Sequence, residues 1–227
     1  MSVTALPRIT LRDRAAEALR DAVLSGRLLP GTAVVEVTLA RELGISRAPL
    51  REAIRQLLEE GLLAQARAWG GVTVAPVDAK VAGELYTLRT TLEIFAFEQL
   101  WDRRDLAFRA ELHRRLAILT KAIDLADDPA TIQAELALHS LVYEASGHGL
   151  LLSTWEGLRG RLQLYWAAHH AAHGRPGPRR DAHDDYVRYA LGKDLEAMRV
   201  ELRAHMRRGL ETVLQFLTTQ PTQKEAP

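Results

Sequence analysis

The sequence predicts a mostly α-helical protein of two domains, a small N-terminal unit followed by an all-helical bundle of about six helices. Apolar residues recur with the spacing of one helix face along almost the whole 227-residue chain. The exception is segment 62–77, where valines alternate with Thr73 and Gly70-Gly71 can turn a two-stranded hairpin. The helical pattern resumes directly after this segment, which predicts a domain boundary there.

Three helices are expected before the hairpin. The first should begin after Thr10, whose hydroxyl can cap it, and end at Gly26. A short helix over residues 38–43 should stop at Gly44, because glycine readily adopts the left-handed conformation at a helix end. The third should begin after Ser46 as its cap and end near Gly61.

The remainder of the chain is expected to form only helices. Asp105 and Asp128 occupy positions that suit helix caps, and Pro129 suits a first helical position. The expected spans are 78–103, 105–126, 129–146, 149–172, 179–191 and 193–217. The expected domains are 1–76, 77–218 and a polar tail at 219–227.

Composition excludes several classes of protein. Hydrophobic residues make up 47% and charged residues 26%, which is typical of a globular chain, and the net charge of +1 is not that of a polycation. The absence of cysteine excludes disulfides, thiolate metal sites and a cysteine nucleophile. No apolar run has the length of a signal peptide core or a membrane span. We therefore expect a soluble, cytoplasmic protein with no membrane partner.

Arginines follow one side of the third expected helix. Arg47, Arg51 and Arg55 recur every fourth residue beside an apolar stripe. Three helices and a hairpin are the layout of a winged helix-turn-helix DNA-binding domain, in which arginines near the start of the recognition helix contact bases or phosphates. The alternative is a solvated face on which the arginines pair with nearby glutamates such as Glu52 and Glu59.

Glu135 and His139 are four residues apart, so they project from the same face of one helix. His183 and His205 flank a turn at Gly192 and can meet if their two helices fold back antiparallel. One carboxylate and three imidazoles suit zinc or a similar divalent ion. Spacing alone favours the alternative, in which these side chains are ordinary polar contacts.

The segment "LGISRAPLREAIRQL" and its surroundings, over residues 10–75, resemble the N-terminal domain of the GntR family of bacterial transcription regulators. The resemblance implies that Ser46, Arg47, Arg51 and Gly70 contact double-stranded operator DNA. Two positions that are often basic in the family are Val37 and Trp69 here, which removes charge from the expected interface.

Residues 78–217 resemble the FCD ligand-binding domain of the FadR-like branch. "RTTLE" at 89–93 matches an early motif, and His183 and His205 match two histidines 22 residues apart. Glu135 stands where the family has an aspartate. The resemblance implies a metal site at Glu135, His139, His183 and His205, with zinc expected and nickel or manganese as alternatives.

The family also implies a small organic acid as effector. Its carboxylate would complete the metal coordination and pair with Arg89, whose alternative partner is Glu93 in the same helix.

These observations predict a transcription regulator that is controlled by a ligand and is not an enzyme. The resemblance implies a repressor, which is the commoner arrangement in the family. We also expect a homodimer. The apolar stretch 85–101 offers a surface for the second copy. Two alternatives remain: a ligand-independent dimeric DNA-binding protein, and a metal-dependent helical hydrolase suggested by the pair His183-Asp184.

Overall fold

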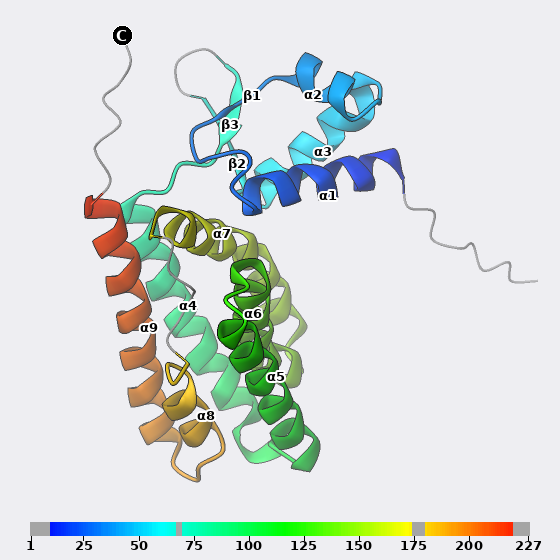
Figure 1. Ribbon diagram of the computed structural model, residues 1–227. Helices are drawn as coiled ribbons and strands as arrows, with labels where there is room; N and C mark the ends of the chain where they lie inside the picture. Colours follow the sequence, from blue (N-terminus) through cyan, green and yellow to red (C-terminus); the bar gives the residue numbers. More distant parts are fainter. Residues whose placement is uncertain (1–9, 67–69, 174–179, 220–227) are drawn as a thin grey trace, which may run out of the picture. The chain divides into compact units, whose positions relative to one another are not determined.

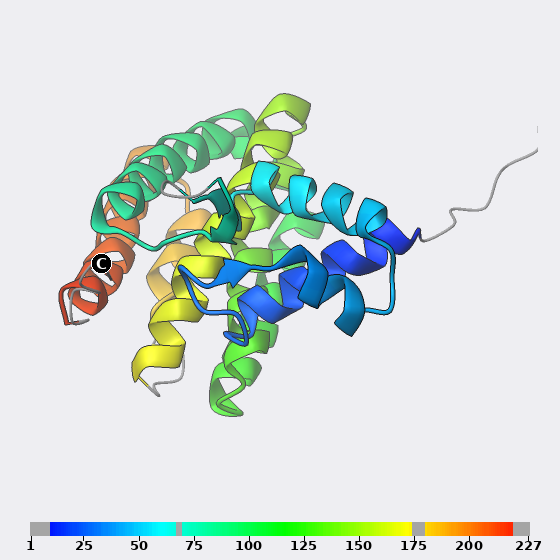
Figure 2. The ribbon, with the colours of Figure 1, turned by 90° about the horizontal axis from the view of Figure 1, so that it is seen from above.

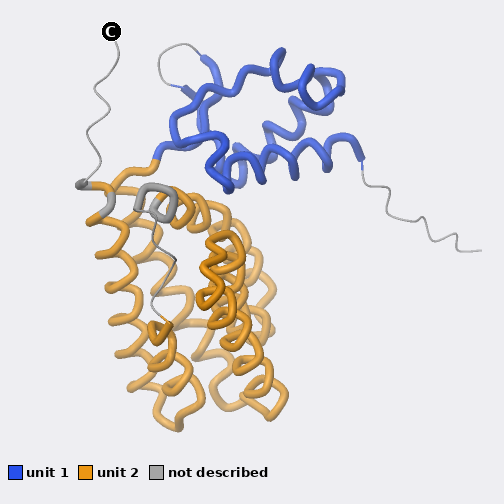
Figure 3. The backbone as a smooth tube through the Cα atoms, viewed as in Figure 1, with its two compact units in different colours: residues 1–76 blue, residues 77–227 orange. Residues whose placement is uncertain are grey.

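A computed structural model describes residues 10–66, 70–173 and 180–219 of the chain. The chain divides into two compact units, 1–76 and 77–227, which are coloured separately in Figure 3. The mostly helical fold class is confirmed, with a small N-terminal sheet and a helical second unit. Position 219 ends the last helix, and the rest of the expected tail lies outside the described residues.

Three helices build the first unit: α1 (Leu11–Leu24), α2 (Glu36–Glu42) and α3 (Arg47–Glu59). Thr10 caps α1 as expected, because its hydroxyl accepts from the Asp13 amide while Asp13 bonds back to Thr10. α1 and α3 lie against each other (Figures 1 and 2), and the buried residues of both helices are apolar. Ser46 holds the N-cap position of α3 as expected, although its side chain makes no hydrogen bond to the helix.

A small sheet completes this unit, with strands β1 (Ala33–Val34), β2 (Leu63–Gln65) and β3 (Val72–Val74) in the order β1-β3-β2. The expected hairpin is confirmed, because β2 and β3 pair antiparallel in the register Leu63 with Val74. Strand β1 was not expected, since two residues are too few to show an alternating pattern. Its pairing with β3 ties the turn after α1 to the hairpin.

Six α-helices and one 3₁₀ turn form the described part of the second unit (Figure 1). Their bounds are α4 (Ala79–Leu100), η1 (Trp101–Arg103), α5 (Leu106–Asp124), α6 (Asp128–Ala145), α7 (Gly149–His173), α8 (Asp184–Ala190) and α9 (Leu195–Thr219). Two expectations are wrong here. Asp127, and not Asp128, caps α6, and the helix expected from residue 179 begins only at Asp184, which leaves His183 at its N-cap.

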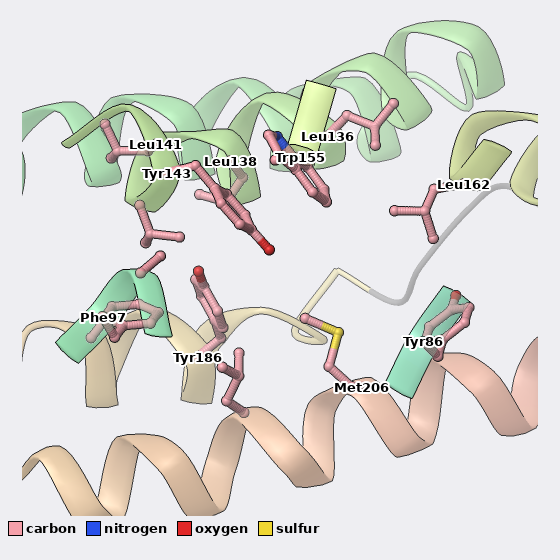
Figure 4. Close-up of a cluster of buried hydrophobic side chains, with 14 of the residues drawn as sticks. Tyr86, Phe97, Leu136, Leu138, Leu141, Tyr143, Trp155, Leu162, Tyr186 and Met206 are labelled. Atoms are coloured by element: carbon pink, nitrogen blue, oxygen red, sulfur yellow. The ribbon is translucent and has the colours of Figure 1, made fainter. Parts of the chain in front are cut away.

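The core of the second unit lies between α4, α6, α7 and α9 and contains several aromatic rings (Figure 4). Gly209 of α9 allows a close approach to α4, because a Cβ at this position would lie 2.9 Å from the Tyr86 ring. In Figure 4 the hydroxyl ends of Tyr143 and Tyr186 turn toward the middle of the bundle. The core is therefore partly polar at its centre. Among the helices the structure describes, none is long and apolar enough to cross a membrane.

Candidate functional site

The arginine stripe of α3 faces solvent. Leu50, Ala53, Ile54 and Leu57 are buried on the opposite side of the helix. The Arg47 and Arg51 side chains are each 58% exposed, at the N-terminal end where a recognition helix approaches bases. Both guanidinium groups can therefore reach a ligand outside the protein.

A carboxylate of α2 holds these two arginines. Arg51 Nε donates to Glu36 Oε2 at 2.8 Å, and Arg47 Nη2 lies 3.5 Å from the same oxygen. The hydrogen bond from Arg51 lowers the pKa of the Glu36 carboxyl below its ordinary value. Sequence reasoning missed Glu36, because the pattern within α3 contains no information about a partner in another helix. Pairing with a glutamate of α3 itself, which was the alternative expected from the sequence, is found for one of the three arginines: Arg55 lies 3.4 Å from Glu52.

The other residues expected at the DNA interface are also exposed where the structure describes them. Ser46 is exposed at the start of α3, and Val37 is 63% exposed on α2. Gly70 adopts a φ of +66°, which favours glycine in the turn before β3. Trp69 lies outside the described residues.

Three histidines meet inside the second unit. His139 comes from α6, His183 from the N-cap of α8 and His205 from α9. Their candidate ligand atoms all lie within 4.8 Å of one another, and His139 Nε2 is 3.3 Å from His183 Nε2. His139 and His183 are buried. His139 and His205 are 66 positions apart in the chain, yet they meet in the folded bundle together with His183.

Glu135 lies at the edge of this cluster. Its Oε1 is 3.5 Å from His183 Nε2, but the group of mutually close ligand atoms contains the three histidines alone. Burial raises the pKa of the Glu135 carboxyl, whereas the contact with His183 and the charge of Arg89 lower it, with a net lowering. The carboxylate is therefore ionised and adjacent to one histidine rather than central to all three.

Glu93 of α4 also contacts the histidine cluster, although the sequence did not indicate it as part of the metal site. Its side chain is 0% exposed, and its Oε1 accepts from His139 Nδ1 at 2.7 Å and from the Tyr186 hydroxyl at 2.8 Å. The pKa of the Glu93 carboxyl is raised on balance, because burial outweighs the opposing effects of Arg89 and Tyr186. No local pattern could reveal this contact, since 46 residues separate Glu93 from His139.

Arg89 is buried one helical turn before Glu93. Its Nε lies 3.4 Å from Glu93 Oε2, and its guanidinium carbon lies 5.6 and 5.5 Å from the ring centroids of Trp155 and Trp166. Its Nη2 has no hydrogen-bond partner among the residues that the structure describes. The expected pairing with Glu93 therefore exists but leaves one buried donor unused, and a buried unused donor is costly.

The cluster fits a divalent metal ion on several counts. Burial, followed by the nearby positive charge of Arg89 and by His183, lowers the pKa of His139 well below 6.5, and burial likewise lowers that of His205. Neutral imidazoles are the form that binds metal. Two nitrogens bound tetrahedrally to zinc lie about 3.3 Å apart, given Zn–N bonds of about 2.0–2.1 Å. The observed 3.3 Å between His139 and His183 matches this separation.

The remaining histidines take no part in the cluster where the structure describes their side chains. His113 is exposed on α5, and His148 accepts from the Leu151 amide at the start of α7. The side chains of His169, His170 and His173 lie outside the described residues. Asp184 is exposed while His183 is buried, so the His-Asp pair of the hydrolase alternative does not share one site.

A surface pocket of about 270 Å³ lies between α5, α6 and α7. It contains Arg115, which is neutralised by Glu111 and Glu144 at 2.7 and 2.6 Å. Neither the three histidines nor Arg89 line this pocket. This pocket is therefore separate from the histidine cluster and from Arg89.

Comparisons with known families match both units. Residues 84–208 match the FCD domain, and residues 11–74 match the gntR family of bacterial regulatory proteins. Both matched ranges contain the sites described above: the first includes Arg89 and all three histidines, and the second includes Arg47 and Arg51.

Among curated relatives, the gluconate operon transcriptional repressor of Bacillus licheniformis is 29% identical over 160 residues, which are 70% of this chain and 65% of that protein. The repressor of the same name from Bacillus subtilis (strain 168) is 30% identical over 152 residues, covering 67% of this chain and 62% of that protein. The match therefore spans just under two thirds of the length of both. A probable D-xylose utilization operon transcriptional repressor of Paenarthrobacter nicotinovorans is 28% identical over 153 residues, 67% of each chain.

Solved structures share the fold. E. coli McbR/YncC has a TM-score of 0.76 at 24% identity, over 92% of this chain and 99% of that chain. A putative transcriptional regulator GntR from Rhodococcus sp. RHA1 has a TM-score of 0.74 at 25% identity, over 90% and 97%. The curated relatives named above are regulators of transcription and not enzymes.

Proposed function

The chain belongs to the GntR family of bacterial regulatory proteins and carries an FCD domain, and from this premise we propose that it is a DNA-binding transcription repressor controlled by a small organic acid. Its operator affinity would depend on the effector bound beside a metal ion in the second unit. The exposed, preorganised Arg47 and Arg51 support the DNA-binding part. The relatives named as repressors of gluconate and D-xylose operons support the regulatory part.

The observation that carries the effector proposal is the unused donor of Arg89. A guanidinium nitrogen that is buried without a partner is best satisfied by an anionic oxygen, because such charge-assisted bonds are the strong ones. His139, His183 and His205 would hold the metal, with zinc favoured by nitrogen donors and nickel or manganese as alternatives. When bound, the ion would supply a Lewis-acidic centre for a carboxylate oxygen. Glu135 would contribute through its contact with His183.

Replacing Arg89 with methionine tests this proposal directly. We expect zinc-loaded wild-type protein to release operator DNA when a carboxylate effector is added, and we expect the variant to need roughly 10-fold to 100-fold more. Loss of one charged hydrogen bond costs about 1.5–3 kcal/mol, which corresponds to that range. The operator is first selected from a random duplex library, and release is followed by fluorescence anisotropy with gluconate and citrate as probes.

Arg114→Met is the matched control, because Arg114 is exposed on α5 and pairs with Glu111 of the same helix. Unchanged release by the Arg89 variant would remove Arg89 from the effector site. If neither probe, nor a wider panel of small carboxylates, changed operator affinity in the zinc-loaded protein, the ligand-independent DNA-binding alternative would replace the proposal.

We also propose that the protein is a homodimer, because two recognition helices are normally needed to read a two-fold symmetric operator. Most apolar residues in the stretch 85–101 belong to the core of their own bundle, but Leu88 of α4 remains 45% exposed and Val200 of the adjacent α9 64% exposed.

We expect a dimeric mass by light scattering at micromolar concentration and a monomeric mass for the double variant Leu88→Glu, Val200→Glu. A buried charge at an apolar interface is strongly unfavourable. Leu106→Glu is the control, since Leu106 is 84% exposed at the start of α5. A monomeric wild type that still binds operator tightly would contradict the proposal.

A further inference from the structure

Glu93 connects the two halves of the site in the second unit. It is completely buried on α4 and faces donors from two other helices, α6 and α8, as well as Arg89 of its own helix. Oε1 accepts from His139 Nδ1 and from the Tyr186 hydroxyl, at 2.7 and 2.8 Å. Because a carboxylate only accepts, this contact places the proton of the neutral His139 ring on Nδ1 and leaves the Nε2 lone pair directed to the other histidines.

The second oxygen of Glu93 faces the arginine. Oε2 lies 3.4 Å from Arg89 Nε and 3.5 Å from the Tyr143 hydroxyl. Tyr143 stacks on Trp155 with ring centroids 4.5 Å apart, and Trp155 donates to Ser140 at 2.8 Å. The guanidinium lies over the rings of both Trp155 and Trp166, while Nη2 stays without a partner among the described residues.

We infer that Glu93 is a positioning residue shared by the metal and the effector. One oxygen sets the His139 tautomer that presents Nε2 to the metal, and the other sets Arg89 so that Nη2 is free for a carboxylate oxygen. The inference rests on the proposed function and adds a physical link to it. The metal and the effector would both depend on Glu93, although neither would contact its side chain.

Glutamine cannot perform both tasks. An amide offers one oxygen and one NH₂ group, so one of the two sides must face a donor instead of an acceptor. With the oxygen toward Arg89, the NH₂ group opposes His139 Nδ1 and the Tyr186 hydroxyl. With the oxygen toward His139, the NH₂ group faces Arg89, which is also a donor. Removal of the negative charge also leaves the buried guanidinium without its counter-charge.

The test compares full-length wild type with Glu93→Gln by two measurements. In metal-free, ¹⁵N-labelled protein, long-range histidine spectra and arginine Nε spectra are expected to show a protonated His139 Nδ1 and a protected Arg89 Nε–H in the wild type. At least one of the two signatures should be lost in the variant, because the amide oxygen can accept on only one of the two sides. Competition with a chromophoric chelator should then show zinc affinity weakened about 10-fold to 100-fold, which is typical when the partner of a ligating histidine is removed.

Glu98→Gln is the matched control, because Glu98 lies on the same helix and pairs with Arg199 instead of the cluster. It should leave the spectra and the zinc affinity unchanged. Glu93→Asp keeps the charge but withdraws the oxygens, so it should weaken zinc binding in the same direction even if Glu93→Gln does not fold.

A Glu93→Gln variant that keeps the His139 tautomer, the protected Arg89 Nε–H and the wild-type zinc affinity would overturn the inference. A wild type that binds no zinc would overturn the proposed metal site instead. In that case, loss of either spectral signature in Glu93→Gln would still support the positioning role of Glu93, so the two failures are distinguishable.

Discussion

Replacing His205 with alanine is expected to abolish the rise in melting temperature that zinc gives to the metal-free protein. An ion that binds only the folded state stabilises it by about 2.7 kcal/mol when its concentration exceeds the dissociation constant a hundredfold. For a domain of this size, that energy corresponds to roughly 5–10 °C. The variant lacks one of the three histidines whose ligand atoms lie within 4.8 Å of one another. Calorimetry of chelator-treated protein, with and without added zinc, measures the difference.

His113→Ala serves as the control, because His113 is exposed on α5 and outside the cluster. It should retain the full response to zinc. Equal stabilisation of the wild type and the His205 variant would show that the ion binds elsewhere or that the cluster is only polar packing.

The same cluster determines the expected pH dependence. Burial and neighbouring positive charges lower the pKa of His139 and His205 in the folded protein, whereas the unfolded chain takes up protons near the ordinary value of 6.5. The unfolded state therefore binds more protons once the pH falls through about 6.5, and the metal-free protein loses stability in that direction. Protons also compete with zinc for the imidazoles. The zinc-dependent rise should consequently be larger at pH 7.5 than at pH 5.5.

Replacing Arg51 with alanine is expected to weaken specific operator binding by about 1–3 kcal/mol, the contribution of one good base contact. The loss should be smaller on random duplex DNA, because base contacts specify and phosphate contacts only position. The melting temperature should change little, since the side chain is 58% exposed and its ion pair is at the surface. Anisotropy titrations on both duplexes give the comparison. Equal weakening on both would make Arg51 a phosphate contact, and unchanged affinity would argue against α3 as the recognition helix.

Glu36→Gln is the informative companion to Arg51→Ala. Glu36 accepts from Arg51 and approaches Arg47, so it places a negative charge beside the surface that would meet phosphates. Its removal should strengthen binding to random duplex by up to about 1 kcal/mol at low salt and reduce the preference for operator. Glu42→Gln makes the same charge change at the other end of α2. If both variants strengthened binding equally, the effect would come from net charge alone.

Periodicity and turn residues were sufficient to predict most of the helices and the hairpin. Gly44 and Gly61 adopt φ values of +63° and +71° after α2 and α3, as their positions after apolar stripes predicted. These features are local, because a helix end depends on residues within one turn of it. Errors occurred where several local choices had similar energies. Asp127 and Asp128 are both good caps, and α8 begins at Asp184 rather than at 179.

The sequence by itself therefore determined the helical class, the arginine face of α3 and the Glu135–His139 spacing, because each follows from the 3.6-residue repeat of a single helix. Only the tertiary structure decided which side chains meet across helices. It placed His183 and His205 beside His139, with Glu135 at the edge. It also placed Glu93 behind His139 and Glu36 against Arg51. These contacts depend on the packing of helices that are distant in the chain, and no local periodicity contains that information.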